Sequence, residues 1–230
     1  MTRDAQYYSR GEAANYDALI GAQRSLLPVL RKLADPSGKR IADLGAGTGR
    51  LTLQVLPVAA SVAAVDTSEQ MLDRLREKAG LQPEGKLKLA VADHAGTGLD
   101  SCAYDLILGG WSICYGVAPS QPGWEQRLAA IESEMNRIGI PGGDVVLFEN
   151  YGTAAEEPAP PEHLLAYFRS LEERYEFKRT VVRVDYRFAD VREAAARTGA
   201  FFGPETAEKV RRNGWSIVPE FAGVWHRKLE

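Results

Sequence analysis

The sequence predicts an α/β fold with a mainly parallel sheet, and three observations carry this prediction. Short apolar runs typical of strands alternate with amphipathic helical patterns through the first half of the 230-residue chain. The run at Arg40–Leu44 leads into a glycine-rich turn, Gly45-Ala46-Gly47-Thr48-Gly49, and then into a helical pattern. Further strand patterns follow in alternation with helical ones, which is the order of repeated βαβ units. The length exceeds that of one average domain but falls short of two, so we expect a single domain.

The elements of the first half can be placed in order. We expect five strands at Arg40–Leu44, Ser61–Asp66, Lys86–Val91, Tyr104–Gly109 and Asp144–Glu149, and helices at Leu51–Val58, Ser68–Ala79 and Trp124–Ile138. Ser68 suits the N-cap of its helix, with Met71, Leu72 and Leu75 on one face. The breaker Pro141-Gly142-Gly143 is expected to end a helix and turn into the next strand.

The second half of the chain changes character. It opens with a stretch rich in proline and acids at residues 154–163, which predicts a loop or the entry to an inserted segment. We expect a helix over Glu162–Glu176, a strand over Arg179–Phe188, helices over Asp190–Thr198 and Pro204–Arg212, and a last strand over Trp215–Trp225. The first forty residues are expected to form one or two helices laid over the sheet.

Composition excludes several classes of protein. A net charge of −3 and a pI near 5.8 give no basic surface for nucleic acid or an anionic membrane. Two cysteines are too few for a disulfide framework, and no spaced cluster of Asp, Glu or His suggests a metal site. With no secretory segment and no apolar run long enough to span a bilayer, we expect a cytoplasmic protein. The oligomeric state is left open.

The glycine loop is typical of an anion-binding turn, but its pattern departs from two common ones. No Lys-Ser/Thr pair follows it, which disfavours a triphosphate-binding loop. The third glycine of a dinucleotide fingerprint would fall at Arg50, whose bulk would obstruct close packing of helix on strand. Asp43, two residues before the first glycine, would repel a pyrophosphate but suits a ligand that carries an ammonium group.

Asp66 ends the second expected strand, 21 positions after Gly45, which is the spacing of a ribose-binding acid. Its carboxylate can accept hydrogen bonds from both sugar hydroxyls. The alternative is an Asp that caps the next helix. Because the run "SVAAVD" and the spacing agree with the loop, we favour the ribose role.

Five segments in order, "IADLGAGTGR", "VAAVDTSEQMLDRLR", "LAVADH", "YDLILGG" and "RIGIPGGDVVLFEN", resemble the class I S-adenosylmethionine-dependent methyltransferases. The resemblance covers residues 39–150 and implies that these residues form the cofactor-binding core. It implies a Rossmann-like, doubly wound sheet of seven mostly parallel strands with the last one antiparallel. It also implies an N-terminal helical cap at residues 1–38 and C-terminal strands with a helical substrate lid at 151–230, within one domain.

The resemblance implies S-adenosyl-L-methionine as cofactor, held by Tyr16, Asp43, Gly45, Ala46, Gly47, Gly49, Asp66, Thr67, Met71, Asp93, His94, Gly109 and Gly110. In this set Asp43 balances the ammonium group, directly or through water, and Met71 lies against the adenine. Asp93 accepts from the adenine amino group, although a loop-capping Asp is the alternative. His94 packs on the adenine or is a turn residue. Tyr16 belongs to a segment, residues 7–17, that folds over the cofactor or else packs on the sheet without touching it.

The acceptor is expected to lie under the loops that follow strands four to six. The candidate acceptor-binding residues are Trp111, Tyr115, Glu149, Tyr151 and Tyr186, although aromatic residues at such positions are often core residues. Glu149 would act as a base, orient an amine or meet a nearby Arg. No catalytic residue is assigned.

The leading hypothesis is therefore methyl transfer to the oxygen or nitrogen of a small molecule, with no nucleic-acid or membrane partner. The alternatives are a nicotinamide-dependent oxidoreductase, which Arg50 and Asp43 disfavour, and a non-catalytic module that binds the cofactor as a partner subunit.

Overall fold

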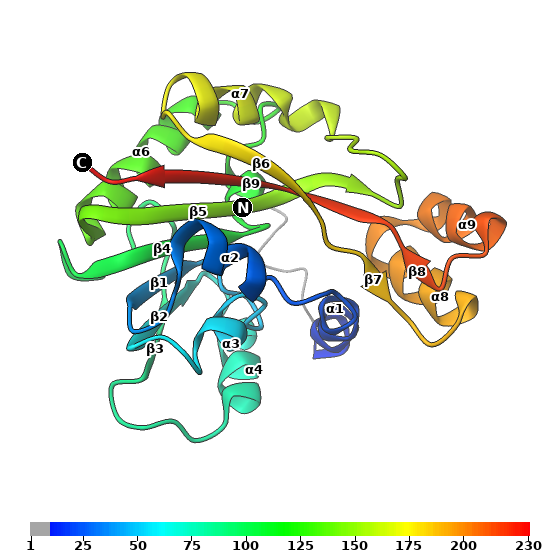
Figure 1. Cartoon of the computed structure of the whole chain (residues 1–230), viewed down its shortest axis with the longest axis horizontal. Helices are drawn as coiled ribbons and strands as arrows, with labels where there is room; N and C mark the ends of the chain where they lie inside the picture. Colours follow the sequence, from blue (N-terminus) through cyan, green and yellow to red (C-terminus); the bar gives the residue numbers. More distant parts are fainter. Residues whose placement is uncertain (1–9) are drawn as a thin grey trace. The chain divides into compact units, whose positions relative to one another are not determined.

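The computed structural model describes the backbone of residues 10–230 and the side chains from residue 15 onward (Figure 1). Residues 7–9 of the segment predicted to cover the cofactor lie outside this range. The helices are α1 (Arg10–Gly21), α2 (Leu27–Ala34), α3 (Thr52–Val55), α4 (Glu69–Ala79), α5 (Ile113–Gly116), α6 (Trp124–Ile138), the 3₁₀ turn η2 (Glu162–Leu164), α7 (Leu165–Glu173), α8 (Val191–Phe202) and α9 (Pro204–Asn213). The strands are β1 (Arg40–Leu44), β2 (Ser61–Asp66), β3 (Leu87–Val91), β4 (Tyr104–Gly110), β5 (Gly139–Thr153), β6 (Lys178–Arg183), β7 (Tyr186–Arg187), β8 (Ile217–Val218) and β9 (Glu220–Lys228).

Seven of these strands form one sheet in the order β3-β2-β1-β4-β5-β9-β6, and β7 pairs with β8 in a second, two-stranded sheet. The pairs β2–β3, β1–β2, β1–β4 and β4–β5 are parallel. Strand β9 runs antiparallel to β5, as the arrows in Figure 1 show. The predicted class, a doubly wound, mostly parallel sheet of seven strands with the last one antiparallel, is confirmed. The substrate lid stays a prediction.

The first half of the chain follows most of the predicted elements. The helix expected over Leu51–Val58 is limited to Thr52–Val55, and the main correction is at β5. The expected breaker at Pro141-Gly142-Gly143 lies inside the strand, because α6 ends at Ile138 and β5 begins at once with Gly139. Tyr104 pairs with Gly139 and Leu106 with Asp144, so the residues between them bulge out of the ladder. Gly142 makes this possible with a φ of 77°.

The second half corrects two strand predictions. The expected strand Arg179–Phe188 is split into β6 and β7, and Trp215–Trp225 is split into β8 and β9. Pro219 separates β8 from β9, since proline has no N–H to donate to a ladder. Between β6 and β7, the Asp185 carboxylate accepts from Glu220 N at 3.2 Å and from Arg183 Nε at 2.8 Å. These side-chain contacts separate β6 from β7, although the alternating pattern of the sequence continues through both strands.

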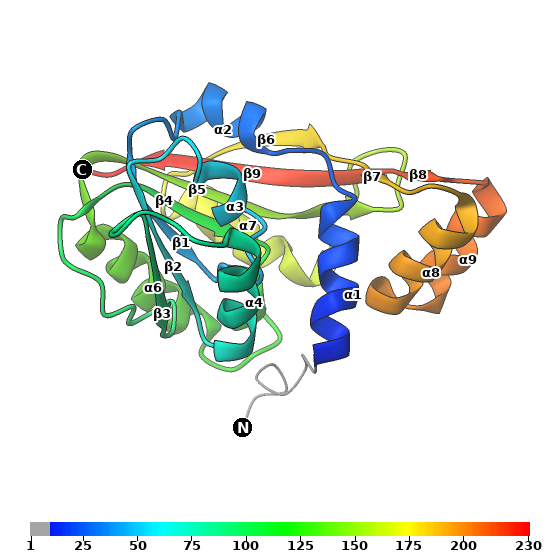
Figure 2. The ribbon, with the colours of Figure 1, turned by 90° about the horizontal axis from the view of Figure 1, so that it is seen from below.

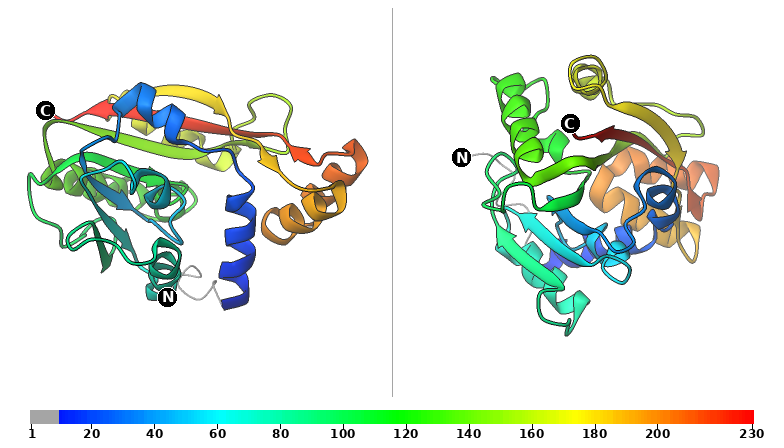
Figure 3. Two further views of the ribbon diagram at one scale, coloured as in Figure 1. Left: turned by 60° about the horizontal axis from the view of Figure 1, so that its bottom comes forward. Right: turned by 60° about the vertical axis from the view of Figure 1, so that its left-hand side comes forward.

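The contacts divide the chain into two compact units. Unit 2, made of residues 26–149, 161–180 and 224–230, holds the parallel strands and the glycine loop. In this unit α2, α3 and α4 lie on one face of the sheet and α6 and α7 on the other (Figures 2 and 3). Of the described residues, unit 1 comprises 10–25, 150–160 and 181–223, with α1, α8, α9 and the β7–β8 pair. The predicted division of one domain at residues 38 and 150 stays a prediction.

Candidate methyl-donor and acceptor site

Strand register brings the predicted site residues of unit 2 to one edge of the sheet. Leu44 of β1 pairs with Val65 on one side and Gly109 on the other, and Gly109 pairs with Leu147. One step further along the parallel strands, Gly110 pairs with Phe148, and Asp66 ends β2. The glycine loop follows Leu44, Thr67 follows Asp66, Trp111 follows Gly110, and Glu149 follows Phe148. Ligands of open parallel sheets bind outside these carboxyl ends.

All three loop glycines adopt positive φ, 73° at Gly45, 54° at Gly47 and 96° at Gly49. At Gly45 an added Cβ would lie 2.3 Å from Ser112 Cβ and 2.7 Å from His94 Nε2, and at Gly49 it would lie 2.5 Å from Leu75 Cδ1. At Gly47 the nearest atom is Met71 Cε at 3.7 Å. The first and third glycines are therefore needed for close packing, whereas the middle one leaves the backbone open to a ligand.

Asp66 lies beside the middle glycine. Its Oδ2 accepts from Gly47 N at 2.8 Å and its Oδ1 from Ser68 N at 2.9 Å. Ser68 in turn caps α4 by accepting from Met71 N at 3.3 Å. The half-buried carboxylate thus joins the loop to the start of α4, and each oxygen keeps a second lone pair for a further donor.

Asp43 points its carboxylate into the protein. It is 1% exposed, and its Oδ2 accepts from Thr52 N at 3.0 Å and Thr52 Oγ1 at 2.6 Å at the start of α3. Burial raises the pKa of Asp43 to about 6. The carboxylate stabilises the turn that carries the glycines, a contact that the sequence did not indicate.

His94 and Thr48 supply buried polar atoms next to the loop. His94 Nε2 and Thr48 Oγ1 have no hydrogen-bond partner among the described residues. The ring is close to Gly45 and to Ser112, whose Oγ donates to Leu44 O at 2.8 Å. Burial lowers the pKa of His94, so the neutral ring is favoured. Unpaired buried groups of this kind mark a place that a ligand or water fills.

Asp93 forms an ion pair that the sequence did not reveal. Its Oδ2 accepts from Arg127 Nη2 of α6 at 2.6 Å, and its Oδ1 accepts from Ala95 N at 2.9 Å. These hydrogen bonds and the guanidinium charge hold the pKa of Asp93 below its usual value against the opposing effect of burial. The side chain is still 42% exposed, so the carboxylate remains accessible.

Trp111 stands in a strained position directly after Gly109 and Gly110. Its φ is 51°, which is uncommon for a bulky residue and is typical of functional sites. The Arg50 guanidinium carbon lies 3.4 Å from the centre of the indole, and Phe148 stacks on it at 5.8 Å. The indole Nε1 is buried with no hydrogen-bond partner among the described residues. Arg50, which sequence reasoning used only to exclude a dinucleotide site, thus orders the predicted acceptor side.

Glu149 is a buried carboxylate directly after Phe148, which pairs with Gly110 at the end of β4. Its Oε1 accepts from Cys114 N of α5 and from Tyr167 Oη of α7, both at 3.1 Å. Oε2 is buried and has no hydrogen-bond partner among the described residues. Burial raises the pKa of Glu149 to about 7. Neither Cys114 nor Tyr167 was singled out from the sequence.

The remaining predicted residues are spread over the surface and the core. Tyr115 is 53% exposed, on α5. The other three aromatic residues belong to unit 1. Tyr186 is 2% exposed and packs in the core of that unit against Phe188 and Phe202, so its ring contributes to packing. Tyr151 is also buried, and Tyr16 of α1 lies 5.6 Å from the Phe201 ring.

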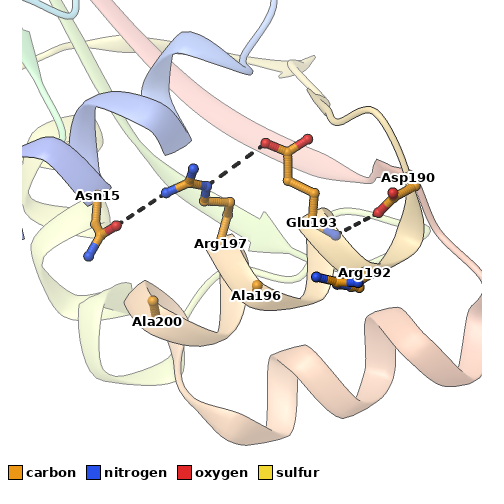
Figure 4. A pocket seen from close by; sticks show the side chains of 7 residues that line it. All are labelled: Asn15, Asp190, Arg192, Glu193, Ala196, Arg197 and Ala200. Atoms are coloured by element: carbon orange, nitrogen blue, oxygen red, sulfur yellow. Dashed lines mark hydrogen bonds and ion pairs between the residues drawn. The ribbon is translucent and has the colours of Figure 1, made fainter.

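A groove of about 610 Å³ in unit 1 is a competing location for a site (Figure 4). It is lined by residues of α1 and α8 and by Asp190, and none of the residues predicted for cofactor or acceptor lies in it. Arg197 lies between Asn15 Oδ1 at 3.2 Å and Glu193 Oε1 at 3.9 Å, and Asp190 accepts from Glu193 N at 2.8 Å. Its polar groups largely satisfy one another, so we place the candidate site at the glycine loop.

The residues at the loop fit S-adenosylmethionine better than a nucleotide with phosphates. The open middle glycine, the Asp66 carboxylate and the unpaired His94 nitrogen form a cradle, while Arg50 fills the place that a dinucleotide leaves to a third glycine. No cluster of three or more potential metal ligands occurs among the residues that the structure describes. A glycine loop after β1, an acid after β2 and an antiparallel last strand define the class I methyltransferase fold.

Comparison with known proteins gives the same class. Residues 41–143 match the family described as a methyltransferase domain. This part of the chain is therefore similar to methyltransferase domains, and the chain resembles the class I S-adenosylmethionine-dependent methyltransferases. It is 28% identical over 134 residues to the biotin biosynthesis bifunctional protein BioHC of Saccharophagus degradans, and 33% identical over 85 residues to magnesium-protoporphyrin O-methyltransferase of Rhodobacter capsulatus. These matches cover 58% and 37% of this chain but only 22% and 37% of the relatives' own length.

Two solved structures share the fold across nearly the whole chain. Phosphoethanolamine N-methyltransferase 2 of Haemonchus contortus, solved with S-adenosylhomocysteine and phosphomonomethylethanolamine, superposes with a TM-score of 0.61 at 15% identity, over 99% of this chain and 58% of that one. A protein of Pyrococcus horikoshii described as a candidate RNA methyltransferase superposes with a TM-score of 0.55 at 16% identity, over 98% of this chain and 88% of that one. At such identities the likeness concerns the fold alone. No described helix has the length and apolar character needed to cross a membrane.

Proposed function

We propose that the protein transfers the methyl group of S-adenosylmethionine to an oxygen or nitrogen of a small-molecule acceptor. The observation that carries the proposal is the glycine loop, whose middle N–H is held by Asp66 at 2.8 Å, at the carboxyl ends of β1 and β2. A carboxylate in this place suits two adjacent sugar hydroxyls. The cofactor supplies a methyl group on a positively charged sulfur, and the chain's residues bind and orient the two reactants.

The positions of the predicted residues at the ends of the strands support the following cofactor contacts. Asp66 would accept from the ribose, with Thr67 beside it, and Met71 would contact the adenine. Asp93 would accept from the adenine amino group while it keeps its ion pair with Arg127. Gly109 pairs with Leu44, which precedes the loop, and the carbonyls of Gly109 and Gly110 would suit an ammonium group.

The acceptor would lie beyond Gly110, next to Trp111. The positive φ and a buried indole N–H without a partner among the described residues support a binding role for Trp111. Methyl transfer is an in-line displacement, so correct positioning of the acceptor supplies most of the catalytic effect. Trp111, with Phe148 and Arg50 against its ring, would provide a rigid wall for that purpose.

A small organic acceptor agrees with the charge of the chain. A net charge of −3 does not provide the positive surface that the phosphate backbone of RNA requires. The two free cysteines suit a reducing compartment, which is the basis for proposing a cytoplasmic location.

Calorimetric titration with S-adenosylhomocysteine and with NADH tests the proposal. We expect micromolar binding of S-adenosylhomocysteine and none of NADH. Asp66→Ala should weaken the binding by about 1.5–3 kcal/mol, the loss expected for hydrogen bonds to a charged group. The exposed Asp73→Ala on α4 serves as the matched control and should bind as the wild type does. Binding of NADH alone, or of a tRNA at physiological salt, would overturn the proposal.

A further inference from the structure

A buried carboxylate beside the proposed acceptor position has one oxygen left to bind a ligand. Glu149 is 1% exposed, yet its Oε2 has no hydrogen-bond partner among the described residues. An unpaired carboxylate oxygen is costly to bury, and native structures rarely leave one without a donor. The other carboxylate oxygen, Oε1, has hydrogen-bond partners that hold the side chain in place.

Two donors fix the carboxylate through its other oxygen. Cys114 N comes from the first turn of α5, and the Tyr167 hydroxyl comes from α7, each 3.1 Å from Oε1. Tyr167 is itself fully buried and packs against Phe168 at 5.5 Å. The side chain is therefore anchored from two elements, which leaves Oε2 in a set position.

The short segment from Trp111 to Cys114 links Glu149 to the glycine loop. Cys114 lies two residues after Ser112, whose Cβ is 2.3 Å from the position of an added Cβ at Gly45. Trp111 N donates to Phe148 O at 2.7 Å, which ties the ends of β4 and β5 together just before Glu149. Glu149 thus directly follows Phe148, the last residue of β5 that pairs with β4, as Trp111 directly follows its partner Gly110.

We propose that Glu149 is the residue that selects the acceptor: its Oε2 accepts a hydrogen bond from a nitrogen or oxygen that carries a proton, and takes up that proton as the methyl group is transferred. The inference rests on the proposed function. As the acceptor's lone pair forms its bond to the methyl carbon, the carbon–sulfur bond breaks with its electrons on sulfur, and the acceptor's proton passes to Glu149. The acceptor class is a neutral alcohol, phenol or amine. A carboxylate acceptor is excluded, because it would meet a second buried carboxylate.

The surroundings of Glu149 set its protonation. The groups that face it are the Cys114 thiol and amide of α5, the Tyr167 hydroxyl of α7 and the charge of Arg50 before α3. Burial raises its pKa to about 7, against the lowering effect of those hydrogen bonds and of Arg50. A base that titrates near neutral pH can both accept the proton and release it to water.

The test compares the binding of phenol and benzoate to protein saturated with S-adenosylhomocysteine, by calorimetry. In the wild type at pH 8 we expect phenol to bind at least tenfold more tightly than benzoate. Glu149→Gln keeps an oxygen for Cys114 and Tyr167 but presents an NH₂ group, so the preference should be lost or reversed. Glu84→Gln, at an exposed position of unit 2, should keep the wild-type preference.

A second readout needs no variant. As the pH falls from 8 to 6, Glu149 becomes protonated, and benzoate should bind the wild type more tightly while phenol changes little. Equal affinities for phenol and benzoate at pH 8, or an unchanged preference in Glu149→Gln, would overturn the inference, as would the absence of phenol binding. Those outcomes with intact S-adenosylhomocysteine binding contradict this inference alone, whereas loss of S-adenosylhomocysteine binding itself contradicts the proposed function.

Discussion

Replacing Glu149 by Gln should change how the stability of the protein depends on pH. The folded-state pKa of Glu149 is raised from 4.5 to about 7, chiefly by burial. A raised pKa means that the folded protein binds this proton more tightly than the unfolded chain does. Its contribution to stability is therefore fully present below pH 4.5 and is lost as the pH rises through about 7.

The size of the effect follows from the shift. One pKa unit corresponds to about 1.4 kcal/mol, so the free energy of unfolding should fall by about 3 kcal/mol on account of Glu149 across this window. The Gln variant has no proton to lose. Asp43 and Glu132 also have raised pKa values, of about 6 and about 7, but they titrate in both proteins, so the difference between the proteins isolates Glu149.

The assay is urea unfolding of both proteins without ligand between pH 5 and 8, followed by circular dichroism. Relative to the variant, the wild type should lose stability steadily as the pH rises, and Glu84→Gln should follow the wild type. A difference between the wild type and Glu149→Gln that stays constant within about 0.5 kcal/mol over this range would refute the assigned burial and protonation of Glu149.

Three further predictions concern the loop, the adenine and α1. Gly45→Ala and Gly38→Ala both place Ala at φ near 70°, but only the Ala at position 45 would meet Ser112. Gly45→Ala should therefore lower the free energy of unfolding by about 1 kcal/mol more than Gly38→Ala does. Equal losses in the two variants would contradict the packing at the loop. Asp93→Asn should weaken the binding of S-adenosylhomocysteine and strengthen the binding of an inosine analogue. If the variant binds both ligands as the wild type does, Asp93 is only a turn residue. Hydrogen exchange of the amides at 15–21 should slow when S-adenosylhomocysteine is added, and unchanged exchange would contradict a lid.

The parallel core could be predicted from sequence because its signals are local. Each strand is an apolar run, and the glycine loop follows β1 without a gap. The bounds of β1, β2 and α6 agree with the expected ones. The interruption between β8 and β9 also has a local cause in Pro219, which the apolar run around it concealed.

The partners of the site residues could not be predicted, since they are distant in the chain. Arg127 meets Asp93 across 34 positions, and Tyr167 meets Glu149 across 18. The role of the Asp43 carboxylate was also hard to predict. Its position in the sequence suggested contact with a ligand, whereas its hydrogen bonds in the structure are with Thr52. Aromatic residues are the hardest case, and Tyr186 belongs to a packed core although its sequence suits a binding wall equally well.

The most direct test of the central claim is a crystal structure of the chain with S-adenosylhomocysteine. The account predicts both ribose hydroxyls within about 2.5–3.2 Å of the Asp66 carboxylate, with the amino-acid end of the ligand against Gly45–Gly49. A ligand bound in the groove of α1 and α8, with Asp66 still held only by Gly47 and Ser68, would contradict it.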